Sequence, residues 1–143
     1  MEKTNGNDVE EKTARAVGRD LNISTKQSIE ICNYVRGNKV DEAIKKLEDA
    51  INKKSAVPFK RFNKDTGHKR NIAAGRYPMK ASMNIIKVIE SAAANARNIG
   101  LNDNLVIKKI VANKAARPYR YGRRRRVKMK RSHIEVVVGE AKK

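Results

Sequence analysis

The chain has 143 residues and is strongly basic, with 34 Lys and Arg against 15 Asp and Glu and a formal net charge of +19. Its hydrophobic residues are enough for one modest core, no apolar run approaches the roughly 20 residues of a membrane span, and the single Cys excludes an internal disulfide or a multi-cysteine zinc site. The positive charge is the footprint of a nucleic-acid-binding protein, and the polar first twelve residues do not resemble a signal peptide, so we expect a soluble, intracellular protein.

The N-terminal region is predicted to be a tail followed by a strand. Residues 1–13 carry four acids and two lysines without periodicity, and we interpret them as a disordered tail before a single domain, residues 14–143. Residues 14–23 have the pattern of an extended strand, on which Arg15 and Arg19 point to the same side. Two interpretations of these arginines stay open: contacts with phosphates, or a solvated strand face.

Two short helices are predicted next. Ser24 offers an N-cap, apolar residues follow at helical spacing, and Gly37 ends the first helix. We interpret Cys32 as a small buried residue of this helix. A second helix is predicted from Asn38 to about Lys54, again with one apolar face. We expect its opposite face to point away from a polyanion, because that face carries four acids: Asp41, Glu42, Glu48 and Asp49.

Periodicity is lost in residues 55–77, a segment that we call the basic loop. It mixes basic residues with aromatics and glycines, and a loop of this length is usually functional or disordered. Phe59 and Phe62 are open to two interpretations, plugging the core or stacking on bases. The candidate RNA-binding residues of the loop are Lys60, Arg61, His68, Lys69, Arg70, Arg76 and Tyr77.

A long helix is predicted from Pro78, as its first residue, to a stop at Gly100. Its apolar stripe makes it the central core helix. The run 92–94 of three alanines indicates close packing against something flat, most naturally a sheet formed by the first strand and the base of a hairpin. The stripe consists of Ser82, Ile85, Ile86, Ile89, Ala92, Ala93 and Ala96.

The hairpin is predicted at about residues 104–138, because residues 105–112 and 132–138 are rich in β-branched residues. Between them, residues 113–131 carry ten Lys or Arg and no acid, and we call this segment the basic tip. Pro118 and Gly122 supply turn chemistry there. The thirteen residues from Leu105 to Arg117 reach about 43 Å at roughly 3.3 Å each, beyond the ~30 Å span of a small domain, so the tip must protrude. We expect it to be disordered until a polyanion orders it.

Most of the candidate RNA-binding residues lie in this tip, and its two tyrosines favour stacking on bases or sugars. The fold class that follows is α+β, with three helices packed on a small antiparallel sheet and a long protruding β-hairpin. Together with Arg15, Arg19 and the loop residues, the candidates are Lys114, Arg117, Tyr119, Arg120, Tyr121, Arg123, Arg124, Arg125, Arg126, Lys128, Lys130 and Arg131.

No constellation for catalysis is found in the sequence. His68 and His133 lie far apart without a partnered Ser or Cys motif, and no phosphate-cradling glycine loop or pair of acids in an apolar pattern occurs. We interpret His68 as a loop contact and His133 as a strand surface residue. The sequence therefore predicts no enzyme, no metal and no cofactor.

Four passages resemble the universal large-subunit ribosomal protein twenty-two family (bacterial numbering) in its archaeal and eukaryotic version. The resemblance extends from the Arg15 strand to Val138, and the loop passage is the more specific sign of that branch. The end of the chain soon after Val138 favours an archaeal-type protein. The passages are residues 18–24, residues 57–61 with 67–68 and 75–78, residues 95–96, and residues 131–134.

The resemblance implies a cytoplasmic ribosomal protein whose body lies on the outer face of the large subunit, near the nascent-peptide exit tunnel. The hairpin would then reach inward through ribosomal RNA, with neighbouring ribosomal proteins and the nascent peptide as further partners and no membrane. The family's tip pattern falls on Arg117, Pro118, Arg120, Gly122 and Arg123, which would line the tunnel.

Clamping of distant RNA segments is the function that these observations favour. The alternative is an architectural or chromatin-like DNA-binding protein, whose basic arm would lie in a groove. A DNA arm does not require the basic loop, whereas an RNA clamp uses it. A third class, an RNA-modifying enzyme, lacks a cofactor site or an acid-base set in this sequence.

Overall fold

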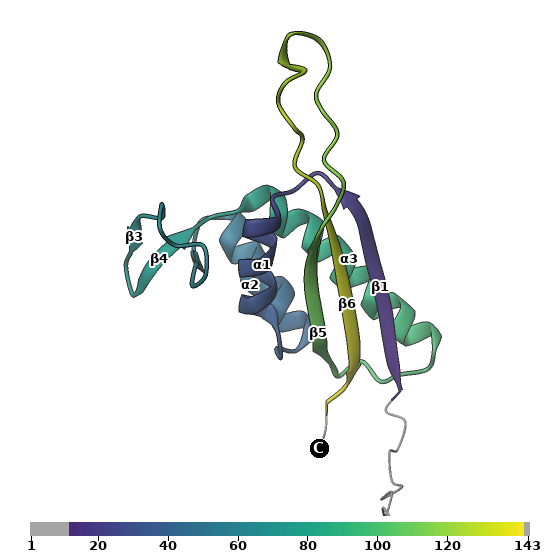
Figure 1. Cartoon of the computed structure of the whole chain (residues 1–143). Helices are drawn as coiled ribbons and strands as arrows, with labels where there is room; N and C mark the ends of the chain where they lie inside the picture. The colour runs from purple at the N-terminus through teal and green to yellow at the C-terminus, as the bar shows by residue number, and fades with distance from the viewer. Residues whose placement is uncertain (1–11, 142–143) are drawn as a thin grey trace, which may run out of the picture.

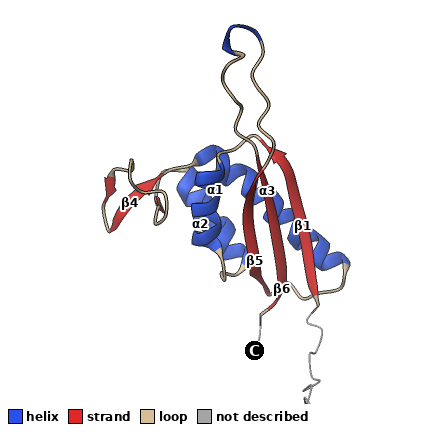
Figure 2. Ribbon diagram, viewed as in Figure 1, coloured by secondary structure: helices blue, strands red, loops and turns tan. Residues whose placement is uncertain are grey.

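Three helices cover one face of a three-stranded antiparallel sheet, and a long hairpin projects from that sheet (Figures 1 and 2). The structure is a computed structural model and describes residues 12–141. The α+β class predicted from the sequence is confirmed. In chain order the elements are β1 (Thr13–Leu21), α1 (Thr25–Val35), α2 (Val40–Ile51), β2 (Val57–Pro58), β3 (His68–Lys69), β4 (Ile72–Arg76), α3 (Met79–Asn98), β5 (Leu105–Lys114), the 3-10 turn η1 (Gly122–Arg124) and β6 (Ser132–Glu140).

The main sheet has the order β1-β6-β5, so the last strand lies between the first strand and the other arm of the hairpin. Alternate side chains of β6, namely Ile134, Val136 and Val138, are fully buried. Ala14 and Ala16 of β1 are buried beside them. This alternation follows from the two-residue period of a strand, and the opposite, more exposed face of the sheet carries charged residues together with valines such as Val17 and Val137. Of the predicted tail, Thr13 already belongs to β1, Lys12 is described and exposed, and residues 1–11 lie outside the described residues.

Helix α3 packs flat on this sheet, as its small residues predict. Ala92 and Ala96 are fully buried, and the helix also buries Val88, which the predicted stripe omitted. The approach is close at Gly18 of β1, where a Cβ atom would lie 2.7 Å from Cγ2 of Val88. Pro78 is the residue before α3 rather than its first residue.

Helices α1 and α2 form the rest of the core layer, beside β5 and α3 (Figure 1). Helix α2 starts at Val40 with Lys39 as the capping position, not at Asn38. The reason is that the Asn38 side chain is used between the helices: its amide donates to the Tyr34 carbonyl oxygen (3.1 Å) and its oxygen accepts from Lys46 Nζ (3.0 Å). Cys32 is buried as predicted, and this desolvation raises the pKa of its thiol to about 12.

The basic loop is more ordered than its lack of periodicity indicates. It contains a second small sheet with the order β2-β4-β3, which projects sideways from the helices (Figure 1). Phe59 belongs to the core, with only 4% of its surface exposed, and its backbone N–H donates to the Ala74 carbonyl oxygen (2.9 Å). Phe62 is half-buried at the surface. The sequence left the same two interpretations open for both phenylalanines, whereas in the structure Phe59 lies in the core and Phe62 lies at the surface.

The hairpin extends well beyond the body, as the length of its arms predicts (Figure 1). Pro118 lies in an arm, where its carbonyl oxygen accepts from the Met129 N–H (2.8 Å), and not in the turn. The turn is formed by η1, at whose start Gly122 has a positive φ of 64°. The expectation that a partner orders this tip stays a prediction.

Candidate nucleic-acid interface

Hydrogen bonds hold the root of the hairpin, where β6 begins, against the end of β1 and the start of α1. Ser132 is fully buried; its hydroxyl donates to the Ile23 carbonyl oxygen (3.2 Å) and lies 2.7 Å from the hydroxyl of Thr25. One residue on, Nδ1 of His133 accepts the backbone N–H of Asp20 (3.1 Å). His133 is therefore not only a surface residue of the strand, because its side chain also joins β6 to the irregular end of β1.

The basic tip exposes nearly all of its charged side chains. Tyr121 is 93% exposed, and Tyr119 lies beneath the ammonium of Lys128, 5.1 Å from the ring centroid. The predicted RNA-binding residues from Lys114 to Lys130 are exposed, and Arg131 is half-buried. The tip contains no acid, so its positive charge is offset by no carboxylate of its own. Such a surface offers a row of contacts for successive phosphates.

A buried acid holds the start of the basic loop. Glu30 of α1 is only 1% exposed, and its carboxylate accepts the backbone N–H groups of Lys60 (3.1 Å), Arg61 (2.8 Å) and Phe62 (2.7 Å). With the backbone fixed in this way, the side chains of Lys60 and Arg61 remain exposed. Sequence analysis missed Glu30, and the available signal was that it is the one acid in α1.

The predicted residues of the basic loop fall into two groups. His68, Lys69 and Arg70 lie in and after β3, on the sideways extension, where Lys69 Nζ is 5.8 Å from the centroid of the Tyr77 ring. Arg61 and Arg76 instead line a cavity of about 350 Å³ between the loop and the root of the hairpin. Lys130 of the basic tip lines the same cavity, so the fold brings the two predicted basic segments together there.

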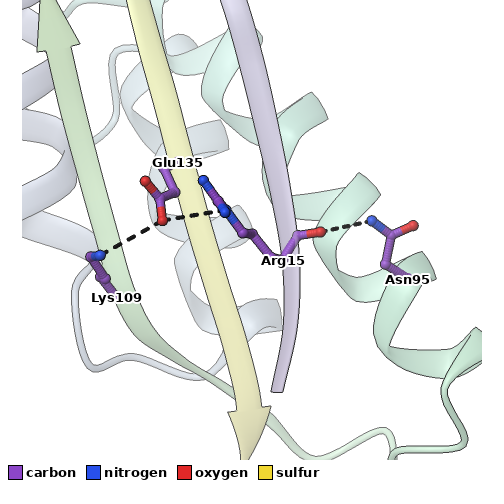
Figure 3. Close-up of polar contacts among 4 residues, drawn as sticks. All are labelled: Arg15, Asn95, Lys109 and Glu135. Atoms are coloured by element: carbon purple, nitrogen blue, oxygen red, sulfur yellow. Dashed lines mark hydrogen bonds and ion pairs between the residues drawn. The ribbon is translucent and has the colours of Figure 1, made fainter.

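The arginines of β1 lie on the exposed face of the main sheet. Arg15 Nε is 3.4 Å from a carboxylate oxygen of Glu135, and Lys109 Nζ is 3.6 Å from the same oxygen (Figure 3). The Arg15 carbonyl oxygen also accepts from the Asn95 side chain on α3 (2.9 Å). Arg15 thus also joins the sheet to its neighbours, while Arg19 is exposed. Their contacts with phosphate stay predictions.

Other kinds of site are not indicated in the described part of the chain. Within residues 12–141, no group of three or more His, Cys, Asp or Glu side chains is placed to hold a metal ion. None of the helices described for this chain is long and apolar enough to cross a membrane.

Comparison with known proteins gives a consistent result along most of the chain. A family model described as ribosomal protein L22p/L17e matches residues 16–139. Similar proteins named large ribosomal subunit protein uL22 come from Methanosphaera stadtmanae (42% identical; 92% of each chain covered) and Methanococcus aeolicus (43% identical; 90% of each chain covered). Another comes from Methanocaldococcus jannaschii, 44% identical over 91% of this chain and 89% of the relative. The matches include the body, the basic loop and the hairpin.

Proposed function

The chain belongs to the ribosomal protein L22p/L17e family, in its archaeal type, and from this premise we propose that it is a structural component of the large ribosomal subunit of the cytoplasmic ribosome. Its relatives are ribosomal proteins and not enzymes. In this role it binds large-subunit ribosomal RNA and clamps RNA segments that are distant in sequence. Its hairpin tip lines the nascent-peptide exit tunnel, close to neighbouring ribosomal proteins.

The observation that carries this proposal is the exposed, acid-free basic tip at the end of the projecting hairpin. Each Lys or Arg that neutralises a phosphate releases a counterion, which supplies sequence-independent affinity. The planar guanidinium of arginine also binds phosphate through two hydrogen bonds or stacks on a base. RNA is then selected by its shape, because the deep major groove of A-form RNA is too narrow for side chains to read.

The clamping role is supported by the directions of the two basic segments. The hairpin and the small sheet of the basic loop leave the body on different sides (Figure 1). One compact body thus presents cations to two separate surroundings. The tunnel-lining role rests on the family resemblance of the tip. Of its residues, Gly122 and Arg123 lie in the terminal turn, and Arg117, Pro118 and Arg120 lie in the arm that leads to it.

The test is RNA binding by the full chain and by a variant in which Arg123, Arg124, Arg125 and Arg126 are all changed to Ala. If about ten phosphates are engaged, log K falls with log salt at a slope of roughly −7 to −9 for a large-subunit RNA fragment. The variant binds the RNA more weakly, and its slope of log K against log salt is shallower by the contribution of up to four phosphate contacts. Its helical circular dichroism is unchanged, because the tip does not support the body.

Competition distinguishes RNA from DNA as the partner. Duplex DNA of matched charge should displace the ribosomal RNA fragment only poorly. Displacement at equal concentration would favour the architectural DNA-binding alternative and contradict the proposal.

A further inference from the structure

A second cavity adjoins the one between the basic loop and the hairpin root. It has a volume of about 360 Å³ and lies between the start of α3 and the arms of the hairpin, with Lys80 and Arg120 among its lining residues. The two cavities share Ser24, Gln27 and Lys130, so they meet at the N-terminus of α1. Together they form a groove that runs from the basic loop to the hairpin.

The charge of this groove suits a polyanion. The first cavity has one acid, Asp65, and the second has none. None of the cations of the groove takes part in an ion pair with another of the residues 12–141. They are Lys26, Arg61, Lys64, Lys80, Arg76, Arg120, Lys128 and Lys130.

An aromatic surface lies among these cations at the basic-loop end. Phe62 lines the first cavity; Arg61 Cζ and Lys26 Nζ lie over its ring, 5.3 and 5.6 Å from the centroid. A flat base entering here finds an aromatic ring and a guanidinium for stacking, and ammonium groups for its phosphates. About 350 Å³ is near the small end of the ~300–1,000 Å³ range of ligand pockets, which suits one nucleotide and not a helix.

The basic-loop wall of the groove and the root of the hairpin are held in place before any ligand arrives. Glu30 fixes the backbone at Arg61 and Phe62, and Ser132 fixes the root of the hairpin that carries Lys130. A preformed site loses less conformational entropy on binding. The Ser24 side chain makes no cap hydrogen bond, which leaves the start of α1 open toward the groove, although the cations and the ring are what define the site.

From these contacts we infer that the groove binds a single-stranded segment of RNA, with one base splayed into the cavity against Phe62 and the flanking phosphates on the cations of both cavities. The inference rests on the proposed function, because it states which form of RNA this site takes. Single strands or bulges are selected because a paired base must first leave its stack, at a cost of a few kcal/mol.

The test uses the full chain and two probes: an eight-nucleotide single-stranded RNA with one 2-aminopurine, and an RNA duplex with the same number of phosphates. The single strand binds more tightly and its 2-aminopurine fluorescence is quenched by stacking. Phe62→Leu keeps an apolar side chain, weakens single-strand binding about five- to 150-fold and abolishes the quenching, whereas Phe62→Tyr preserves both. Duplex affinity stays the same in both variants.

The cations are tested with a matched pair of double variants. Lys26→Gln with Lys64→Gln removes two exposed charges from the groove and weakens single-strand binding. Lys45→Gln with Lys53→Gln removes two exposed charges, one in α2 and one just after it, and leaves single-strand binding nearly unchanged. Equal effects of the two double variants would show that only net charge matters and would overturn the inference.

Unchanged single-strand binding and unchanged quenching in Phe62→Leu would also overturn the groove inference. The proposed function would still stand in that case, provided that the wild-type chain binds a large-subunit RNA fragment. If the wild-type chain fails to bind that fragment, the proposed function fails and the groove inference fails with it.

Discussion

Glu30 is the residue whose removal should disturb the basic loop most. In Glu30→Ala, the backbone N–H groups of Lys60, Arg61 and Phe62 lose an acceptor that lies 2.7–3.1 Å away. A hydrogen bond to a charged group contributes about 1.5–3 kcal/mol, so three of them set an upper range of about 4.5–9 kcal/mol.

Two effects reduce this figure. Lys60 and Arg61 are exposed, so water can reach their amides in the variant, and the variant no longer desolvates a carboxylate. We therefore expect a loss of about 2–5 kcal/mol in the free energy of unfolding. At roughly 4 °C per kcal/mol for a chain of this size, the melting temperature falls by about 8–20 °C.

The assay is thermal and urea unfolding followed by circular dichroism, with amide hydrogen exchange at residues 60–62. Glu30→Gln keeps one acceptor oxygen and loses less stability than Glu30→Ala. Glu48→Ala, at an exposed acid of α2, is the control and changes stability by no more than about 0.5 kcal/mol. If Glu30→Ala were as stable as this control, with residues 60–62 still protected, the carboxylate would not be what holds the loop.

Three further predictions follow from burial and charge. Gly18→Ala places a Cβ atom 2.7 Å from Cγ2 of Val88 and should cost about 1–3 kcal/mol in urea unfolding; a value near zero would mean that β1 and α3 separate easily. Cys32, with its pKa raised by burial to about 12, is almost entirely protonated at pH 8, so iodoacetamide should modify it about a thousandfold more slowly than in the urea-unfolded chain. Because folding raises the pKa of this thiol, the free energy of unfolding should also fall above about pH 9, where the thiol ionises in the unfolded chain but not in the folded one. Alkylation of the folded and unfolded chains at equal rates would contradict the raised pKa and the pH dependence that follows from it. Amides of residues 114–131 should exchange freely in the free chain and become protected in the assembled large subunit, with β6 as the internal standard; protection in the free chain would show that the tip folds without RNA.

Local pattern was enough to predict most of the elements. The three helices, the strands of the hairpin and the protrusion of the tip all follow from periodicity, from β-branched runs and from the reach of an extended chain. Each of these signals depends on residues that are close together in the sequence, so each can be recognised without knowledge of the fold. The errors at Asn38 and Pro118 arose where a side chain or a carbonyl found a partner outside its own element.

What the sequence by itself determined is the presence of an α+β body, its projecting hairpin and the two segments that carry its excess charge. Only the tertiary structure decided that Phe59 enters the core while Phe62 stays at the surface, that Glu30 holds a loop thirty residues away, and that Lys130 meets Arg61 at one cavity. The physical reason is that propensity and charge are properties of neighbouring residues. Burial and hydrogen-bond partnership depend on which distant segments the fold brings into contact.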